Sequence, residues 1–463
     1  MTALTCAPAL TLAELAVRGT DPAGGGPGWG VDARREAVDW ILEHGFPTRK
    51  DEDWRYLPLG SILEHRFSLP VEPVSGPGDQ AGWQEIADSA SLGLGGSRLV
   101  FVDGRFAPSL SRLGRLPPGT LVDGRARAAA ADPERFGEGA PIVTGAVRHA
   151  FEALNVALAA DGALVDVPAG AVVEEPIELV FLGGGGRTPV LSCPRSLIRL
   201  GPRSEATIVE VWAGASDQPY LSDAVTEVEL GEEAEVVHYL FQDQPESAFH
   251  FSSLRVRQAD GSRCASRLVA LGAAVARNEI TVLLEGEGAS VDLDGLYFPR
   301  GVQHHDHPIL VEHAAPRGTS RQRYVGIVDG RGHGVFNGHV VVGPGAAGTD
   351  ASQSDKNLLL SDQAEVDTRP RLEIFTDDVA CAHGAAVGRL DGDALFYLRS
   401  RGIPEARARG LLVQGFVAPV LDRLELGQLR ARVRQRIDRR FATGLGGRVP
   451  PGAAEVRGTE GVE

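Results

Sequence analysis

The pattern of hydrophobic and polar positions changes twice along the chain. Apolar residues first recur at helical spacing, then gather in short β-branched runs between glycine and proline turns, and finally return to helical spacing. A last stretch is poor in apolar residues and is expected to be disordered. The predicted regions are an N-terminal helical region and linker over 1–97, a β core over 98–390, a C-terminal helical domain over 391–443 and a disordered tail over 444–463.

The β core is predicted from a series of short strands. Runs such as 177–182, 206–212 and 235–241 are apolar and β-branched, and turns separate such runs at intervals of roughly 10 to 20 residues. This series is typical of an all-β sandwich, a barrel or a β-helix. Small turns with acidic or glycine corners suit the stacked coils of a solenoid. No strict repeat period is found, so the pattern alone leaves the architectures open.

The sequence patterns of the two regions that flank the β core predict different structures. A helix is predicted over 32–44 from the spacing of its apolar residues. Residues 70–97 are rich in glycine, proline and serine and are expected to form a linker. Near the C-terminus, residues 425–441 place one apolar stripe among arginines. In an acidic chain this stripe favours docking against another protein over contact with RNA or a membrane.

The amino-acid composition excludes several classes of function. The formal net charge is −16, with 46 basic and 62 acidic residues, which argues against a general nucleic-acid-binding protein. No apolar run approaches the roughly 18 residues of a membrane span, and the first ten residues lack the basic segment of a signal peptide. We therefore expect a cytoplasmic protein. Lysine occurs only at positions 50 and 356, neither of them in a Walker A loop, so any ATP-driven step must come from a partner.

The cysteines argue against a self-contained metal site. The chain has four, Cys6, Cys193, Cys264 and Cys381, which are far apart and form no CxxC pair. In a cytoplasmic chain this spacing disfavours a disulfide framework, a zinc finger and a ferredoxin-type cluster. We expect Cys6 and Cys193 to be structural thiols and Cys264 to be inert in the β core.

Cys381 and His383 are the candidate metal ligands. If this stretch is a strand, the two side chains share a face, and their Cα atoms lie about 6.5 Å apart, so a thiolate and an imidazole can reach one metal centre. The opposite face carries small residues that let another backbone approach closely. By itself such a pair is more often a packing feature than a ligand set.

The densest histidine cluster surrounds Asp306. On a strand His304 and Asp306 would point one way, and His305 and His307 the other. His305 and His307 lack a third ligand at metal-site spacing, so we expect them to be hydrogen-bonded framework residues.

Several ordered segments resemble the SufD family, a subunit of the SUF iron–sulfur cluster assembly machinery. Ala364 and Gly384 stand where the related SufB pattern has a cysteine and a glutamate, and both departures favour SufD. The segments that carry the resemblance are 52–56 (EDWRY), 357–361 (NLLLS), 378–385 (DVACAHGA) and 395–403 (LFYLRSRGI).

The resemblance implies a fold and a role. The fold is a right-handed parallel β-helix flanked by N-terminal and C-terminal helical regions. The role is that of a non-catalytic scaffold subunit, which pairs with SufB through the β-helix, binds the SufC ATPase through its C-terminal helices, and forms a homodimer when alone. A transient iron–sulfur cluster would form at the interface with SufB, with His383 as the first candidate ligand and Cys381 as the second.

Two other classes of function stay open. A β-helix carbohydrate lyase or hydrolase would use paired carboxylates, but the adjacent Asp377 and Asp378 would face opposite ways on a strand. The second is a homodimeric interaction protein with no metal role. Copurification with SufB and SufC would distinguish the scaffold from both.

Overall fold

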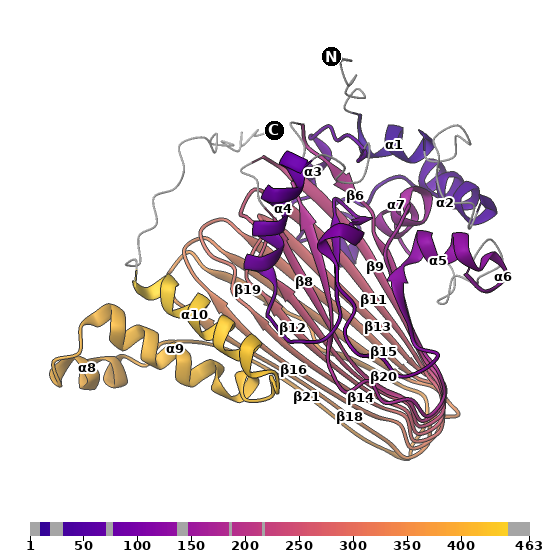
Figure 1. Ribbon diagram of the computed structural model, residues 1–463. Coiled ribbons are helices and arrows are strands. Elements are labelled where there is room, and N and C mark those ends of the chain that lie inside the picture. Colours follow the sequence, from indigo (N-terminus) through magenta and orange to yellow (C-terminus); the bar gives the residue numbers. More distant parts are fainter. Residues whose placement is uncertain are drawn as a thin grey trace, which may run out of the picture.

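The computed structural model describes residues 10–18, 31–70, 77–136, 147–184, 188–214 and 218–442. The disordered tail expected over 444–463 lies outside these residues. The described chain is mainly β, and its strands stack along one axis in about eight turns, which makes the core a parallel β-helix (Figure 1). None of the described helices is long and apolar enough to cross a membrane.

Two sheets form the walls of the β-helix, and because successive strands alternate between them, each coil gives one strand to each sheet. In spatial order the first sheet contains β2 (Arg105–Phe106), β1 (Arg98–Val102), β5 (Ile177–Gly183), β8 (Glu205–Gly214), β10 (Glu235–Gln242), β12 (Arg263–Ala270), β14 (Ser290–Tyr297), β16 (Thr319–Val328), β18 (Thr349–Leu359) and β21 (Val379–Arg389). The second contains β19 (Glu365–Thr368), β17 (His333–Val342), β15 (His304–His313), β13 (Val275–Leu284), β11 (Ala248–Gln258), β9 (Tyr220–Leu230), β7 (Arg195–Leu200), β4 (Ala163–Val167) and β3 (Leu121–Gly124), with β20 (Arg371–Ile374) on β17 and β6 (Leu191–Ser192) on β9. All these pairs are parallel except β1–β2 and β3–β4.

The coils differ in length, which is why the sequence shows no strict period. Glu235 pairs with Arg263 and Arg263 with Ser290, so one coil takes 28 residues and the next 27. Ser290 then pairs with Thr319 and Thr319 with Asp350, which are steps of 29 and 31 residues. The strands keep their register because the turns, which lie at the surface, absorb the difference.

The interior of the β-helix is filled from both sheets. Aliphatic side chains that face inward stack in register, as Val236, Cys264 and Val291 do on three neighbouring strands. Tyr324 is fully buried in this interior, and its ring lies against Gly295, the residue beside it on the neighbouring strand. A residue without a side chain is required there because the ring occupies the space of a Cβ atom.

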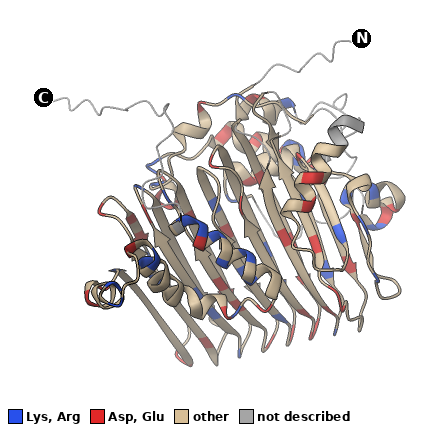
Figure 2. Cartoon of the chain, turned by 60° about the vertical axis from the view of Figure 1, so that its left-hand side comes forward, with Lys and Arg blue, Asp and Glu red and all other residues tan. Residues whose placement is uncertain are grey.

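Helices at the C-terminal end cover the outer face of the first sheet. α9 (Glu405–Leu421) and α10 (Gly427–Ala442) bury Val413, Leu429, Val433 and Ile437 in one cluster with outward-facing sheet residues. Figure 2 marks the positions of the basic residues of these helices in blue. Some of their side chains donate to carbonyl groups of this chain, as Arg440 does to Phe298. The apolar stripe predicted over 425–441 is therefore used within the chain, and the expectation that it docks against another protein is wrong. The remaining helix here is α8 (Gly392–Ser400), which buries none of its residues.

Helices at the N-terminal end cover parts of both sheets. α4 (Pro77–Ala90) packs on the outer face of the first sheet, within the stretch for which composition led us to expect a linker. On the second sheet Phe151 stacks on Phe251 with ring centroids 4.2 Å apart. The other elements of this end are α1 (Leu12–Arg18), α2 (Val31–His44), η2 (Glu52–Trp54), α3 (Gly60–Leu63), η3 (Pro108–Leu110), α5 (Arg125–Ala131), α6 (Pro133–Phe136) and α7 (Ala150–Leu158).

The two ends of the β-helix are finished differently. At the N-terminal end antiparallel partners and helices cover the first strands. At the C-terminal end β21 pairs with β18 on one side only, and no described strand pairs with its outer edge, which we call the open edge. The open edge forms the lower border of the sheet in Figure 1.

Gly295→Ala tests the close approach inside the β-helix. A methyl group at this position overlaps the fully buried ring of Tyr324, which has no free space to move into. We expect a loss of about 1–3 kcal/mol in the free energy of unfolding, measured by urea denaturation. Gly388→Ala is the control, because nothing lies within 4 Å of a Cβ there. Equal stabilities of the two variants would contradict this packing.

Candidate functional site

Cys381 and His383 lie on β21, the last strand of the first sheet. The register pairs Cys381 with Ala351 and His383 with Gln353, and both partners are buried residues that face the interior of the β-helix. The two candidate ligands therefore share the inward face, as the alternation of a strand predicts. No coil of the described chain follows β21, so Cys381 is half-buried against the core and His383 is exposed.

The residues on the other face of β21 have small or no side chains and are exposed to solvent. Ala382, Gly384, Ala386 and Gly388 are all exposed, and nothing lies within 4 Å of a Cβ placed at either glycine. A strand with free backbone groups and minimal side chains is a template for pairing with another chain. The open edge is thus both the place of the candidate ligands and a surface suited to another backbone.

The thiols of the chain differ in their surroundings. Partial burial, with a contribution from Asp350, raises the pKa of Cys381 above its usual value. Full burial raises the pKa of Cys264 to about 12 and that of Cys193 well above its usual value, so these two are inert packing residues. Cys6 lies outside the described residues. Because the thiolate is the metal-binding form, Cys381 must release a proton when it binds a metal ion.

A buried carboxyl group, that of Asp355, lies on the neighbouring strand β18, two residues beyond Gln353. Asp355 is fully buried, accepts a 2.6 Å hydrogen bond from Asn357 Nδ2, and lies 3.4 Å from the hydroxyl of Tyr297. Burial raises the pKa of Asp355 to about 6, although these hydrogen bonds offset part of the shift. Asp355 pairs in register with Ala385, so it lies directly beneath the terminal strand.

Sequence reasoning missed Asp355. A signal was present, because Gln353, Asp355 and Asn357 alternate with other residues and so must share one face of their strand. That this face is the interior follows from the structure alone.

His305 and His307, which flank Asp306, have the framework positions expected for them. His305 and His307 are fully buried inside the β-helix, and burial lowers the pKa of His307 to about 3 and that of His305 well below its usual value. His305 Nε2 lies 2.9 Å from the carbonyl oxygen of Gly272. Both rings are therefore neutral, and neither belongs to a group of three metal-binding side chains among the described residues.

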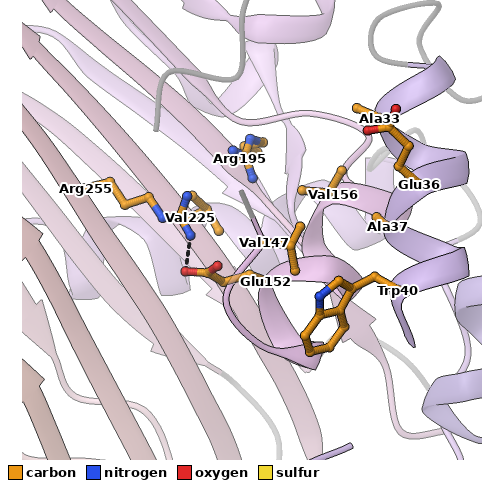
Figure 3. A pocket seen from close by; sticks show the side chains of 10 residues that line it. All are labelled: Ala33, Glu36, Ala37, Trp40, Val147, Glu152, Val156, Arg195, Val225 and Arg255. Atoms are coloured by element: carbon orange, nitrogen blue, oxygen red, sulfur yellow. Dashed lines mark ion pairs between the residues drawn. The ribbon is translucent and has the colours of Figure 1, made fainter. Parts of the chain in front are cut away.

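A cavity of about 300 Å³ lies several coils away, on the outer face of the second sheet (Figure 3). Trp40 forms one wall, and Glu152, Arg195 and Arg255 face it. Glu152 forms an ion pair with Arg255. A carboxylate held in this way is not tuned as a general acid, which weakens the hypothesis of a carbohydrate-active enzyme.

The fold and the open edge define a class of protein, namely a β-solenoid that presents candidate metal ligands on a terminal strand whose outer edge no described strand pairs with. The sequence matches two family descriptions in succession: "SufBD protein N-terminal region" over residues 31–179 and "SUF system FeS cluster assembly, SufBD core domain" over residues 181–416. The chain therefore belongs to the SufBD family of the SUF system for iron–sulfur cluster assembly.

Individual relatives refine this assignment. The iron–sulfur cluster assembly protein SufD of Escherichia coli is 31% identical over 412 residues, which cover 89% of this chain and 93% of that protein. A SufBD family protein of Synechocystis sp. is 32% identical over 416 residues, 88% of this chain and 90% of the relative. SufD of Bacillus subtilis is 28% identical over 297 residues, 63% and 67% of the two chains. These relatives confirm the predicted resemblance to SufD, whereas the roles of His383 and Cys381 stay predictions.

Asp355→Asn tests the buried carboxyl group. Its pKa is raised from 3.8 to about 6 in the folded protein, so the ionised form destabilises the fold, and the destabilisation grows as pH rises from about 4 to about 6. At pH 8 the amide variant should be more stable by up to about 3 kcal/mol, and this advantage should shrink towards pH 5. Urea denaturation at both pH values measures the difference. The exposed Asp39→Asn is the control, and an advantage for Asp355→Asn that does not vary with pH would refute the raised pKa.

Proposed function

We propose that this chain is the scaffold subunit that pairs with SufB, and that a nascent iron–sulfur cluster forms where the open edge meets SufB. The observation that carries the proposal is the position of His383, which is exposed on the terminal strand β21, whose outer edge no described strand pairs with. A ligand buried in the core would be out of reach of a second subunit. If a strand of SufB paired with the open edge, the ligands that SufB contributes would lie beside His383 and Cys381.

Shared coordination follows from the shortage of ligands. Among the described cysteines only Cys381 is accessible, and one thiol with one imidazole cannot complete the four ligands that a cluster takes from protein. A neutral imidazole binds iron without adding charge. The cluster is then cargo that both subunits hold, and it can leave when their interface opens.

The force that opens the interface would come from the SufC ATPase. The chain has no Walker A lysine, so it does not hydrolyse ATP by a P-loop mechanism. We place SufC on α8 and the adjoining part of α9, where Phe396 is 73%, Tyr397 57% and Leu411 42% exposed. Large apolar side chains exposed together are typical of a binding surface. Such a complex is expected in the cytoplasm.

A homodimer is the second candidate state, and the same open edge favours it. An unpaired strand accepts any chain whose edge is complementary, including a second copy of itself. We expect a homodimer only when SufB is absent, with the subunit acting as a scaffold and not as an enzyme.

His383→Ala tests the ligand role. In the complex reconstituted with SufB and SufC, the variant should assemble cluster at least about tenfold more slowly, because a ligand is lost. The rise of cluster absorbance after addition of iron and a sulfur donor measures the rate. His44→Ala, at an exposed histidine of α2, is the control. Cluster assembly at the wild-type rate by an intact His383→Ala complex would refute the role.

Phe396→Ala combined with Tyr397→Ala tests the SufC surface. Removal of two exposed aromatic anchors should weaken SufC binding about tenfold or more, measured by isothermal titration calorimetry with the purified subunits. Leu42→Ala removes an equally exposed apolar side chain from α2 and should leave the affinity unchanged. Equal affinities of the double variant and the wild type would place SufC elsewhere.

A further inference from the structure

A second group of metal-binding side chains lies on the outer face of the second sheet, near its last coil. His333 of β17 and Glu365 of β19 are neighbours in register, and Asp367 lies two residues further on the same face of β19. His333 Nε2 and Asp367 Oδ2 are 2.8 Å apart, and one ligand atom from each of the three residues lies within 4.8 Å of the others. In a tetrahedral zinc site with bonds of about 2.1 Å, ligand atoms are about 3.4 Å apart, so small side-chain shifts suffice.

An unpartnered imidazole lies directly behind this group. His304 of β15 pairs in register with His333, is only 4% exposed, and has its ring centroid 4.6 Å from that of His333. Its Nε2 atom is buried and has no hydrogen-bond partner among the described residues. A buried ring nitrogen without a partner is costly, and a metal ion supplies the partner it lacks.

A second triad of the same molecule shows how the group around His333 differs from a structural ion-pair network. His149, Glu152 and Glu279 form a similar triad, but Glu152 pairs with Arg255 and Glu279 with Arg277, so cations of the protein already neutralise it. Across the described residues, neither Glu365 nor Asp367 has an ion pair with an arginine or lysine. Two carboxylates beside two imidazoles leave an uncompensated negative charge that suits a cation.

We propose that His304, His333, Glu365 and Asp367 bind one divalent transition-metal ion such as Zn²⁺, at a site separate from the open edge. Mixed imidazole and carboxylate ligands suit zinc and its first-row neighbours. The ion joins β15, β17 and β19, three successive strands, and so holds the last coil of the second sheet in place. The ring of Tyr56 lies edge-on to His333, 6.1 Å between centroids, on one side of the site.

The test uses the full-length purified protein, stripped with a chelator and then titrated with Zn²⁺ alone. One equivalent should remain bound after dialysis, as measured by elemental analysis, and the melting temperature should rise by several degrees. His333→Ala and the near-isosteric Asp367→Asn should each weaken zinc binding at least about tenfold and abolish the rise.

Two control variants make the result specific. His339→Ala removes a histidine that faces Glu373 at 3.1 Å on the same sheet but belongs to no group of three metal-binding side chains in the described part of the chain, and this variant should bind zinc normally. His383→Ala should also bind zinc normally, which separates this site from the proposed cluster site. The proposal is overturned if the stripped wild-type protein retains no zinc, or if Asp367→Asn, folded as judged by its melting curve, retains as much as His339→Ala.

Discussion

The in-register stacking of parallel coils is the constraint on which this protein depends. Each strand forms backbone hydrogen bonds with the strand of the preceding coil. The N–H and C=O groups on its other edge then need partners from the next coil. The chain meets this need at the N-terminal end with the antiparallel β2 and β3 and with helices. At the C-terminal end the stack stops at β21, whose outer edge is left without a strand in the described structure. An edge of this kind is usually blunted or covered, which is why we propose that a partner subunit pairs with it.

The same stacking decides how polar groups are distributed near that end. Inward-facing positions are mostly apolar, but buried polar side chains lie among them in several coils; near the terminal strand these are Gln322, Gln353, Asp355 and Asn357. Gln353 Nε2 donates to Gln322 Oε1, and Asn357 Nδ2 donates to Asp355, whereas Gln322 Nε2 and Gln353 Oε1 have no partner among the described residues. The polar groups beside the terminal strand therefore use only part of their hydrogen-bonding capacity within the described chain.

Much of the architecture could be predicted from the sequence, and the errors have physical causes. The β core, its flanking helices and the resemblance to SufD are confirmed. The linker expected over 70–97 contains a helix because tertiary packing against the first sheet outweighs a composition rich in glycine and proline. The stripe over 425–441 was found correctly, but periodicity says that a face is buried without saying against what. The repeat escaped detection because coil lengths vary from 27 to 31 residues over β10 to β18.

The sequence by itself determined the local properties of this protein, which depend on residues close together along the chain. The two-residue period of a strand puts Cys381 and His383 on one face, and the absence of a Walker A lysine removes ATP hydrolysis by a P-loop from this chain. Only the tertiary structure decided that β21, the strand of Cys381 and His383, is the last of its sheet. It also decided that His304, His333 and Glu365 are neighbours in register on three strands. The physical reason is that side-chain alternation is local, whereas register between coils depends on turn lengths and on the packing of the whole stack.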